Sequence, residues 1–121
     1  MTDENYREIG LDLASARQRF LGNRELFEKF LFRFPEDQNF VKIMEAVEAG
    51  QMEDAFNAAH TLKGVCGNLS LSKLYEKVSE ITERLRAEQM PEDEELQALE
   101  EVYQETLELV ASIKEKGIPE F

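Results

Sequence analysis

The only histidine of this 121-residue chain, His60, lies in a segment whose residue types suit chemistry. The segment reads Ala-His-Thr-Leu-Lys-Gly-Val-Cys-Gly-Asn-Leu over residues 59–69. A neutral imidazole nitrogen is a nucleophile at ordinary pH, because the pKa of histidine is ~6.5. Lys63 follows one helical turn later. The sequence therefore marks His60 as a candidate nucleophile with a cation nearby.

Helical spacing separates this histidine from an apolar stripe. At about 100° per residue, one face of a helix over 52–69 collects Ala55, Ala58, Ala59, Leu62, Val65, Cys66 and Leu69. His60 falls on the opposite face, and Gly64 and Gly67 lie beside it. A glycine inside a helix costs up to about 1 kcal/mol relative to alanine, so we expect a role other than helix stability for these two. The pattern predicts an exposed histidine whose neighbours on the same helix face, the two glycines, leave open space beside the ring.

The string His-x-x-Lys-Gly, on a helix rich in small residues and followed by a second amphipathic segment, resembles the histidine-containing phosphotransfer (HPt) domain. That family supplies phosphorelay intermediates in two-component signalling. The resemblance runs from about Ile9 to Leu85. One departure is Ser70, which stands where the family commonly has a glycine ten residues after the histidine. Since serine is small and a good N-cap, we interpret Ser70 as a changed helix junction and not as a lost site.

The resemblance implies a role for each residue of the motif. His60 is the expected phosphoacceptor, Lys63 would counter the phosphoryl charge, and Gly64 would leave room for a loop of the partner. The expected partner is a response-regulator receiver domain, a hybrid histidine kinase or both. The receiver would carry the acceptor aspartate and a bound Mg²⁺, so no cofactor is expected on this chain.

Four further residues near the histidine face are candidates for partner docking, namely Phe56, Asn57, Gly67 and Asn68. Phe56 could belong to an apolar docking patch, or the N-terminal helices could cover it. The two asparagines could hydrogen-bond a partner or merely be solvated. Lys63 could likewise be a solvated lysine, and Gly64 could pack against a neighbouring helix.

Charge and composition exclude several kinds of partner. The net charge is −12 with a pI near 4.5, so nucleic-acid phosphates would be repelled. No apolar run approaches the ~18 residues of a membrane span, and no signal peptide is visible. The lone Cys66 cannot form an internal disulfide. These features predict a cytoplasmic protein that binds neither nucleic acid nor membrane.

The composition also argues against an enzyme. No Ser/His/Asp or Cys/His arrangement is visible beyond the one histidine, and no phosphate-cradling glycine loop of a kinase is present. A carboxylate-bridged metal bundle needs paired Glu-x-x-His units. The only histidine could complete one such unit at most, and the residue three positions before it is Asn57 and not a glutamate. We therefore expect a phosphocarrier without its own catalytic domain. The alternative is a non-phosphorylated helical-bundle adaptor that binds a receiver domain or another protein.

The fold expectation is all-α, because no segment alternates with the period of a strand. Residues 1–121 are expected to form one domain. We expect an antiparallel four-helix bundle over 37–116, preceded by short capping helices over 1–34. The four bundle helices are expected near 37–49, 53–69, 71–88 and 92–116.

Helix starts and stops can be assigned from capping residues. The expected N-caps are Thr2, Asp12, Asn23, and either Ser70 or Ser72. Pro35 is expected to end or kink the third helix. Ile9, Leu26 and Phe30 are expected on the apolar sides of the short N-terminal helices.

Overall fold

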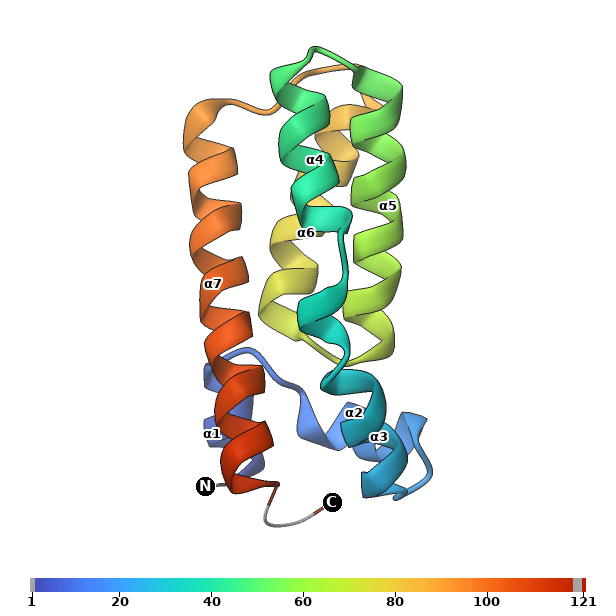
Figure 1. Ribbon diagram of the computed structural model, residues 1–121, viewed down its shortest axis with the longest axis vertical. Coiled ribbons are helices and arrows are strands. Elements are labelled where there is room, and N and C mark those ends of the chain that lie inside the picture. Colours follow the sequence, from blue (N-terminus) through green and yellow to red (C-terminus); the bar gives the residue numbers. More distant parts are fainter. Residues whose placement is uncertain (1, 119–120) are drawn as a thin grey trace.

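The structure, a computed structural model, describes residues 2–118 and 121, and Figure 1 shows that it is built of helices. Along the chain these are α1 (Asp3–Glu8), α2 (Leu13–Arg19), α3 (Arg24–Leu31), the 3₁₀ turn η1 (Phe34–Glu36), α4 (Asn39–Glu48), α5 (Met52–Asn68), α6 (Ser72–Arg86) and α7 (Asp93–Lys116). Within this described part of the chain there is no strand, and the all-α prediction is confirmed.

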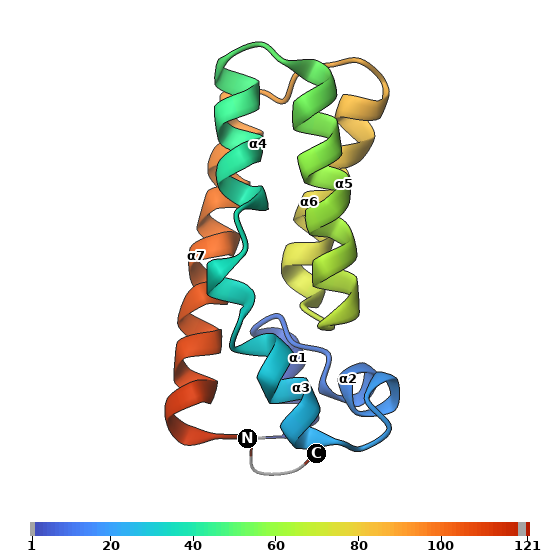
Figure 2. The ribbon, with the colours of Figure 1, turned by 45° about the vertical axis from the view of Figure 1, so that its right-hand side comes forward.

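Helices α4 to α7 form the antiparallel four-helix bundle that the sequence predicts (Figures 1 and 2). Helix α5 packs against α4 and α6, and α6 packs against α7. The ring of Phe40 on α4 stacks on Tyr103 of α7 with centroids 4.0 Å apart, so the first and last helices of the bundle are also in contact. None of the described helices is long and apolar enough to cross a membrane.

The N-terminal helices α1 to α3 lie at the end of the bundle where α5 ends and α6 begins (Figure 2). The backbone N–H of Asp12 donates to the carbonyl of Ser70 at 2.9 Å, which ties the start of α2 to the α5–α6 turn. Helix α7 reaches the same end, where the Arg24 guanidinium donates to the carbonyl of Ile118 at 3.1 Å. The N-terminal segment therefore borders the C-terminal half of the histidine helix.

Three predicted caps are present. Thr2, Asp12 and Asn23 precede α1, α2 and α3, and each side chain accepts a hydrogen bond from the backbone N–H three residues later. These bonds satisfy N–H groups that the first turn of a helix leaves without an intrahelical acceptor. Short-range chemistry thus fixes where the N-terminal helices begin.

The predicted cap of α6 is wrong. Neither Ser70 nor Ser72 caps it, because the N-cap residue is Leu71 and no side chain caps that end. Ser70 instead ends the turn after α5 with a φ of 56°, in the left-handed region that favours glycine. Its hydroxyl is turned inward and donates to the hydroxyl of Ser15 at 3.1 Å. A left-handed backbone here explains why a glycine would suit this position.

Three apolar side chains expected to be buried are exposed, namely Ile9, Leu26 and Phe30, at 43%, 40% and 44%. The reason is that α1 and α3 are short and meet only the end of the bundle, so each buries a narrow stripe. Helix α3 also ends at Leu31, before Pro35, which lies in η1. A proline is accommodated in a first turn because its missing N–H is not needed there.

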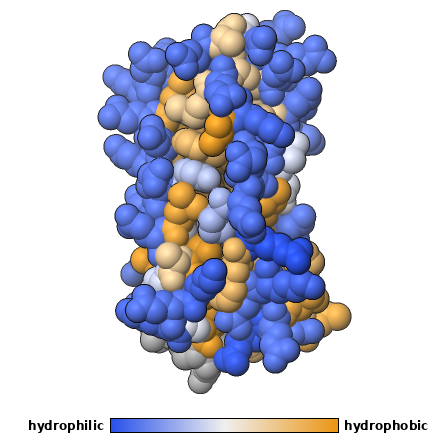
Figure 3. Space-filling model, in the orientation of Figure 1, coloured by the Kyte–Doolittle hydropathy of each residue, from blue (hydrophilic) through white to orange (hydrophobic). Residues whose placement is uncertain are grey.

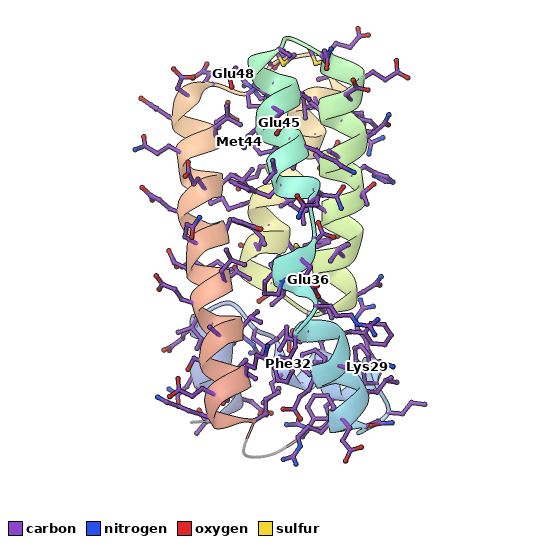
Figure 4. All side chains as sticks on the ribbon, viewed as in Figure 1. Lys29, Phe32, Glu36, Met44, Glu45 and Glu48 are labelled. Carbon is purple, nitrogen blue, oxygen red and sulfur yellow. The ribbon has the colours of Figure 1, made fainter. Side chains whose placement is uncertain are left out.

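The face seen in Figure 1 combines apolar and acidic surface. Apolar residues run down its middle between hydrophilic bands (Figure 3). Figure 4 shows side chains of α3, η1 and α4 on this face, where Phe32 and Met44 are half-buried while Glu36, Glu45 and Glu48 are exposed. Part of the net negative charge is therefore carried by η1 and α4.

Candidate functional site

Helix α5 divides into a buried face and an exposed face. Most of the predicted stripe is buried, although Val65 is only half-buried. Leu62 and Cys66 are fully buried, whereas His60 is exposed. The imidazole thus lies on the side of α5 that a partner could reach.

The histidine is one of the residues that line an open groove of about 490 Å³, which we call the histidine groove. Helix α5 and the turn after it contribute His60, Lys63, Gly64, Cys66, Gly67, Asn68 and Ser70. The other walls are Asp12, Ser15 and Arg19 from the N-terminal segment, and Ser72 and Tyr75 from α6. Three separate parts of the chain therefore line the groove that His60 borders.

The two glycines of the motif have different surroundings. A Cβ at Gly64 would have no atom within 4 Å apart from its own local backbone, so this side of the groove is open. A Cβ at Gly67 would lie 3.4 Å from Cε2 of Tyr75, an ordinary contact distance. The expected clearance beside His60 is present at Gly64, while Tyr75 fills the space beside Gly67.

Lys63 is half-buried and has an aromatic neighbour. Its Nζ lies 5.9 Å from the centroid of the Tyr75 ring, within the range of a cation–π attraction. This contact favours a position of the ammonium group along the groove that also contains His60. The lysine is therefore more constrained than a freely solvated side chain.

Phe56 is half-buried, and its ring is engaged from two helices. It stacks on the imidazole of His60 with centroids 5.8 Å apart and an interplanar angle of 14°. The guanidinium carbon of Arg86 on α6 lies over the same ring, 5.1 Å from its centroid. Phe56 thus has specific neighbours on α5 and α6.

The two asparagines are exposed on either side of the histidine. The backbone carbonyl of Asn57 accepts a hydrogen bond from the Thr61 hydroxyl at 2.9 Å. Asn68 borders both the histidine groove and a second hollow of about 630 Å³, which we call the phenylalanine groove. Its lining residues are Phe20, Phe30, Arg33, Phe34, Glu36, Asp37, Val65, Asn68 and Leu69.

Several groove residues escape sequence reasoning. Arg19 and Ser15 come from α2, more than forty residues before the histidine, and no local pattern links them to it. Arg86 reaches Phe56 across a helix pair in the same way. Tyr75 could have been found from the sequence, because it follows the buried Leu74 and lies just outside the apolar stripe of α6, which places a large aromatic ring at the surface.

Cys66 lines the groove but is unsuited to nucleophilic chemistry. Burial, with a further contribution from the charge of Asp37, raises the pKa of its thiol from 9.0 to about 12. The thiol is therefore protonated at neutral pH, and the thiolate is the reactive form. Among the described residues, no group of three or more His, Cys, Asp or Glu side chains could hold a metal ion.

Comparison with known proteins gives one family. The sequence model of the Hpt domain matches residues 25–113, from the start of α3 to near the end of α7. The match contains the whole histidine helix and leaves α1 and α2 outside. No curated protein and no solved structure gives a significant match.

Proposed function

Because the chain belongs to the Hpt domain family, we propose that it is a phosphorelay intermediate in which His60 accepts a phosphoryl group and exchanges it with the aspartate of a response-regulator receiver domain. Phosphotransfer in two-component systems is what membership of the family implies. The observation that carries the proposal is the exposed imidazole beside the open side of Gly64.

The transfer is a displacement at phosphorus. A lone pair of one ring nitrogen of His60 forms the N–P bond while the P–O bond to the receiver aspartate breaks. The bonding electron pair stays on the aspartate as a carboxylate, and the other ring nitrogen keeps its proton. The reverse reaction returns the group to an aspartate. Mg²⁺ on the receiver would stabilise the charge that develops on the transferred group.

The groove supplies positioning and charge. The ammonium of Lys63, beside Tyr75, would attract the anionic phosphoryl oxygens. Gly64 would admit the receiver loop that carries the aspartate, because in-line transfer requires near-contact distance between the reacting atoms. Arg19 from α2 adds a second cation to the same groove. This helps the highly acidic chain to accept an anionic group.

Docking of the receiver would use the surface around the groove. Asn57 and Asn68 are exposed and could hydrogen-bond to it, while Gly67 keeps the surface low next to Tyr75. The apolar rings of Phe20 and Phe30 in the phenylalanine groove would extend the contact. A hybrid histidine kinase would reach the site through its own receiver domain.

The test is transfer profiling against the phosphorylated receiver domains of the source organism. We expect an acid-labile label on the wild-type chain and none on His60→Gln. The circular dichroism and melting temperature of His60→Gln should match those of the wild type, because the imidazole is exposed. Receiver binding without label would contradict the proposal and favour an adaptor. A loss of folding in His60→Gln would mean that the ring is structural.

A further inference from the structure

Two stacked rings and a guanidinium are neighbours at the site, namely those of His60 and Phe56 on α5 and Arg86 on α6. We propose that Phe56 is a positioning residue, which holds the imidazole of His60 so that a ring nitrogen faces the incoming phosphorus. Arg86 in turn holds the ring of Phe56. The inference rests on the proposed function and assigns Phe56 a role other than docking.

The imidazole needs such support because it is exposed. An exposed side chain samples several rotamers, and each rotamer aims the ring nitrogens differently. Phe56 precedes His60 by four residues, the spacing at which helix side chains are neighbours. The centroid separation of 5.8 Å and the interplanar angle of 14° fit an offset parallel stack. The stack therefore favours one orientation of the ring.

The geometry of the stack leaves the reactive atoms accessible. The lone pair of an imidazole nitrogen lies in the plane of the ring, whereas Phe56 is stacked against the ring with an offset. In-line approach to phosphorus occurs along that plane and is not obstructed by a neighbour above or below it. A parallel aromatic ring can thus restrain the nucleophile without shielding it.

The support reaches a second helix. Arg86 lies over the Phe56 ring at 5.1 Å, and its Nε donates to Oε1 of Glu83 at 3.3 Å. The guanidinium of α6 thus contacts both a carboxylate of its own helix and an aromatic ring of α5. Phe56 is half-buried and packs against the core, so its ring is less free than the exposed imidazole and can act as a surface for it.

The experiment separates positioning from docking. Phe56→Leu keeps an apolar side chain but removes the flat ring, and Phe56→Tyr restores it. Phe32→Leu is the matched control, because Phe32 is half-buried like Phe56 and lines neither groove. Each variant is tested for receiver affinity and for single-turnover transfer from a saturating phosphorylated receiver.

We expect Phe56→Leu to slow transfer at saturation by about tenfold or more, since small misplacements of reacting groups have effects of this size. Its receiver affinity should be unchanged, and Phe56→Tyr should transfer like the wild type. Phe32→Leu should leave both the affinity and the saturated rate unchanged. If Phe56→Leu loses only affinity, or transfers at the wild-type rate, the inference is wrong.

A second measurement does not depend on a receiver. As the only histidine, His60 gives two carbon-bound imidazole proton signals that need no further assignment. The ring current of Phe56 should shift these signals in the wild type and in Phe56→Tyr, and Phe56→Leu should remove the shift. Unchanged signals in Phe56→Leu would disprove the stack, whatever the transfer assay gives. A wild-type chain that accepts phosphate from none of the receivers would refute the proposed function instead, and the signals would still decide whether the stack exists.

Discussion

The hydroxyl of Ser70 donates a hydrogen bond to the hydroxyl of Ser15 at 3.1 Å. This bond joins the turn after the histidine helix to α2, which lies outside the region that matches the Hpt domain. The same turn accepts the backbone N–H of Asp12 at 2.9 Å. Through these contacts the N-terminal segment brings Arg19 to the groove of His60.

The backbone at Ser70 gives the first prediction. With a φ of 56°, any side chain is strained here, and the left-handed form costs roughly 1–2 kcal/mol for a residue with a Cβ. Ser70→Gly and Ser70→Ala both lose the hydroxyl, but only glycine relieves the strain. Ser70→Gly should therefore be more stable than Ser70→Ala by about 1 kcal/mol in urea denaturation. Equal stability of the two variants would show that the turn is unstrained.

The second prediction concerns Lys63. Lys63→Ala should slow phosphotransfer by about tenfold, with a smaller effect on receiver affinity, because its charge acts on the transferred group. Lys42→Ala is the control, since Lys42 is exposed on α4 and does not line the groove. Single-turnover transfer and equilibrium binding measure the two effects separately. A loss confined to binding would make Lys63 a docking residue.

The third prediction is an alkaline loss of stability. The pKa of the Cys66 thiol is raised from 9.0 to about 12 in the fold, so between these values the unfolded chain releases a proton that the native chain retains. The contribution of the protonated Cys66 thiol to the free energy of unfolding is therefore complete below pH 9 and decreases as the pH rises toward 12. This group contributes a slope of up to about 1.4 kcal/mol per pH unit.

Denaturation of Cys66→Ala over the same pH range provides the comparison. Its stability should fall less steeply with pH than that of the wild type, even if its absolute stability is lower. Burial also raises the pKa of the Tyr103 phenol, with smaller contributions from Asp37 and Cys66, so a residual slope of the same sign is expected. Parallel pH profiles of the two proteins would argue against the raised thiol pKa.

Local sequence patterns predict much of this structure. The bounds of α5, the exposure of His60 and the caps at Thr2, Asp12 and Asn23 all follow from helical period and from hydrogen bonds within one turn. Such features depend on residues three or four apart, which can be read directly along the chain.

The remaining features depend on tertiary placement. Ile9 and Phe30 are exposed because α1 and α3 cover only a small part of the bundle. The periodicity of these helices does not predict how much of the bundle they cover. The position of Arg19 in the groove results from bonds between the N-terminal segment and the α5–α6 turn. The left-handed backbone at Ser70 does not follow from the sequence, because a serine at that junction indicates an N-cap.

The last prediction uses Gly64, where stability and function should respond in opposite directions. A Cβ there meets open space, and Gly64 is exposed within α5. Gly64→Ala should therefore stabilise the fold by about 0.4–1 kcal/mol, because it reduces the backbone entropy of the unfolded chain. Gly64→Leu should also fold, yet its side chain would occupy the space that the receiver loop needs, so transfer should be lost or strongly reduced.

Thermal melts and single-turnover transfer from a phosphorylated receiver test both variants of Gly64. Gly67→Ala is a comparison at the second glycine, since its added methyl group would contact Tyr75 and would not project into open space. Gly67→Ala should lose less transfer activity than Gly64→Leu, because the ring of Tyr75 already occupies that side of the groove. If Gly64→Leu transfers at the wild-type rate, no receiver loop passes over Gly64, and the proposed approach to His60 is wrong.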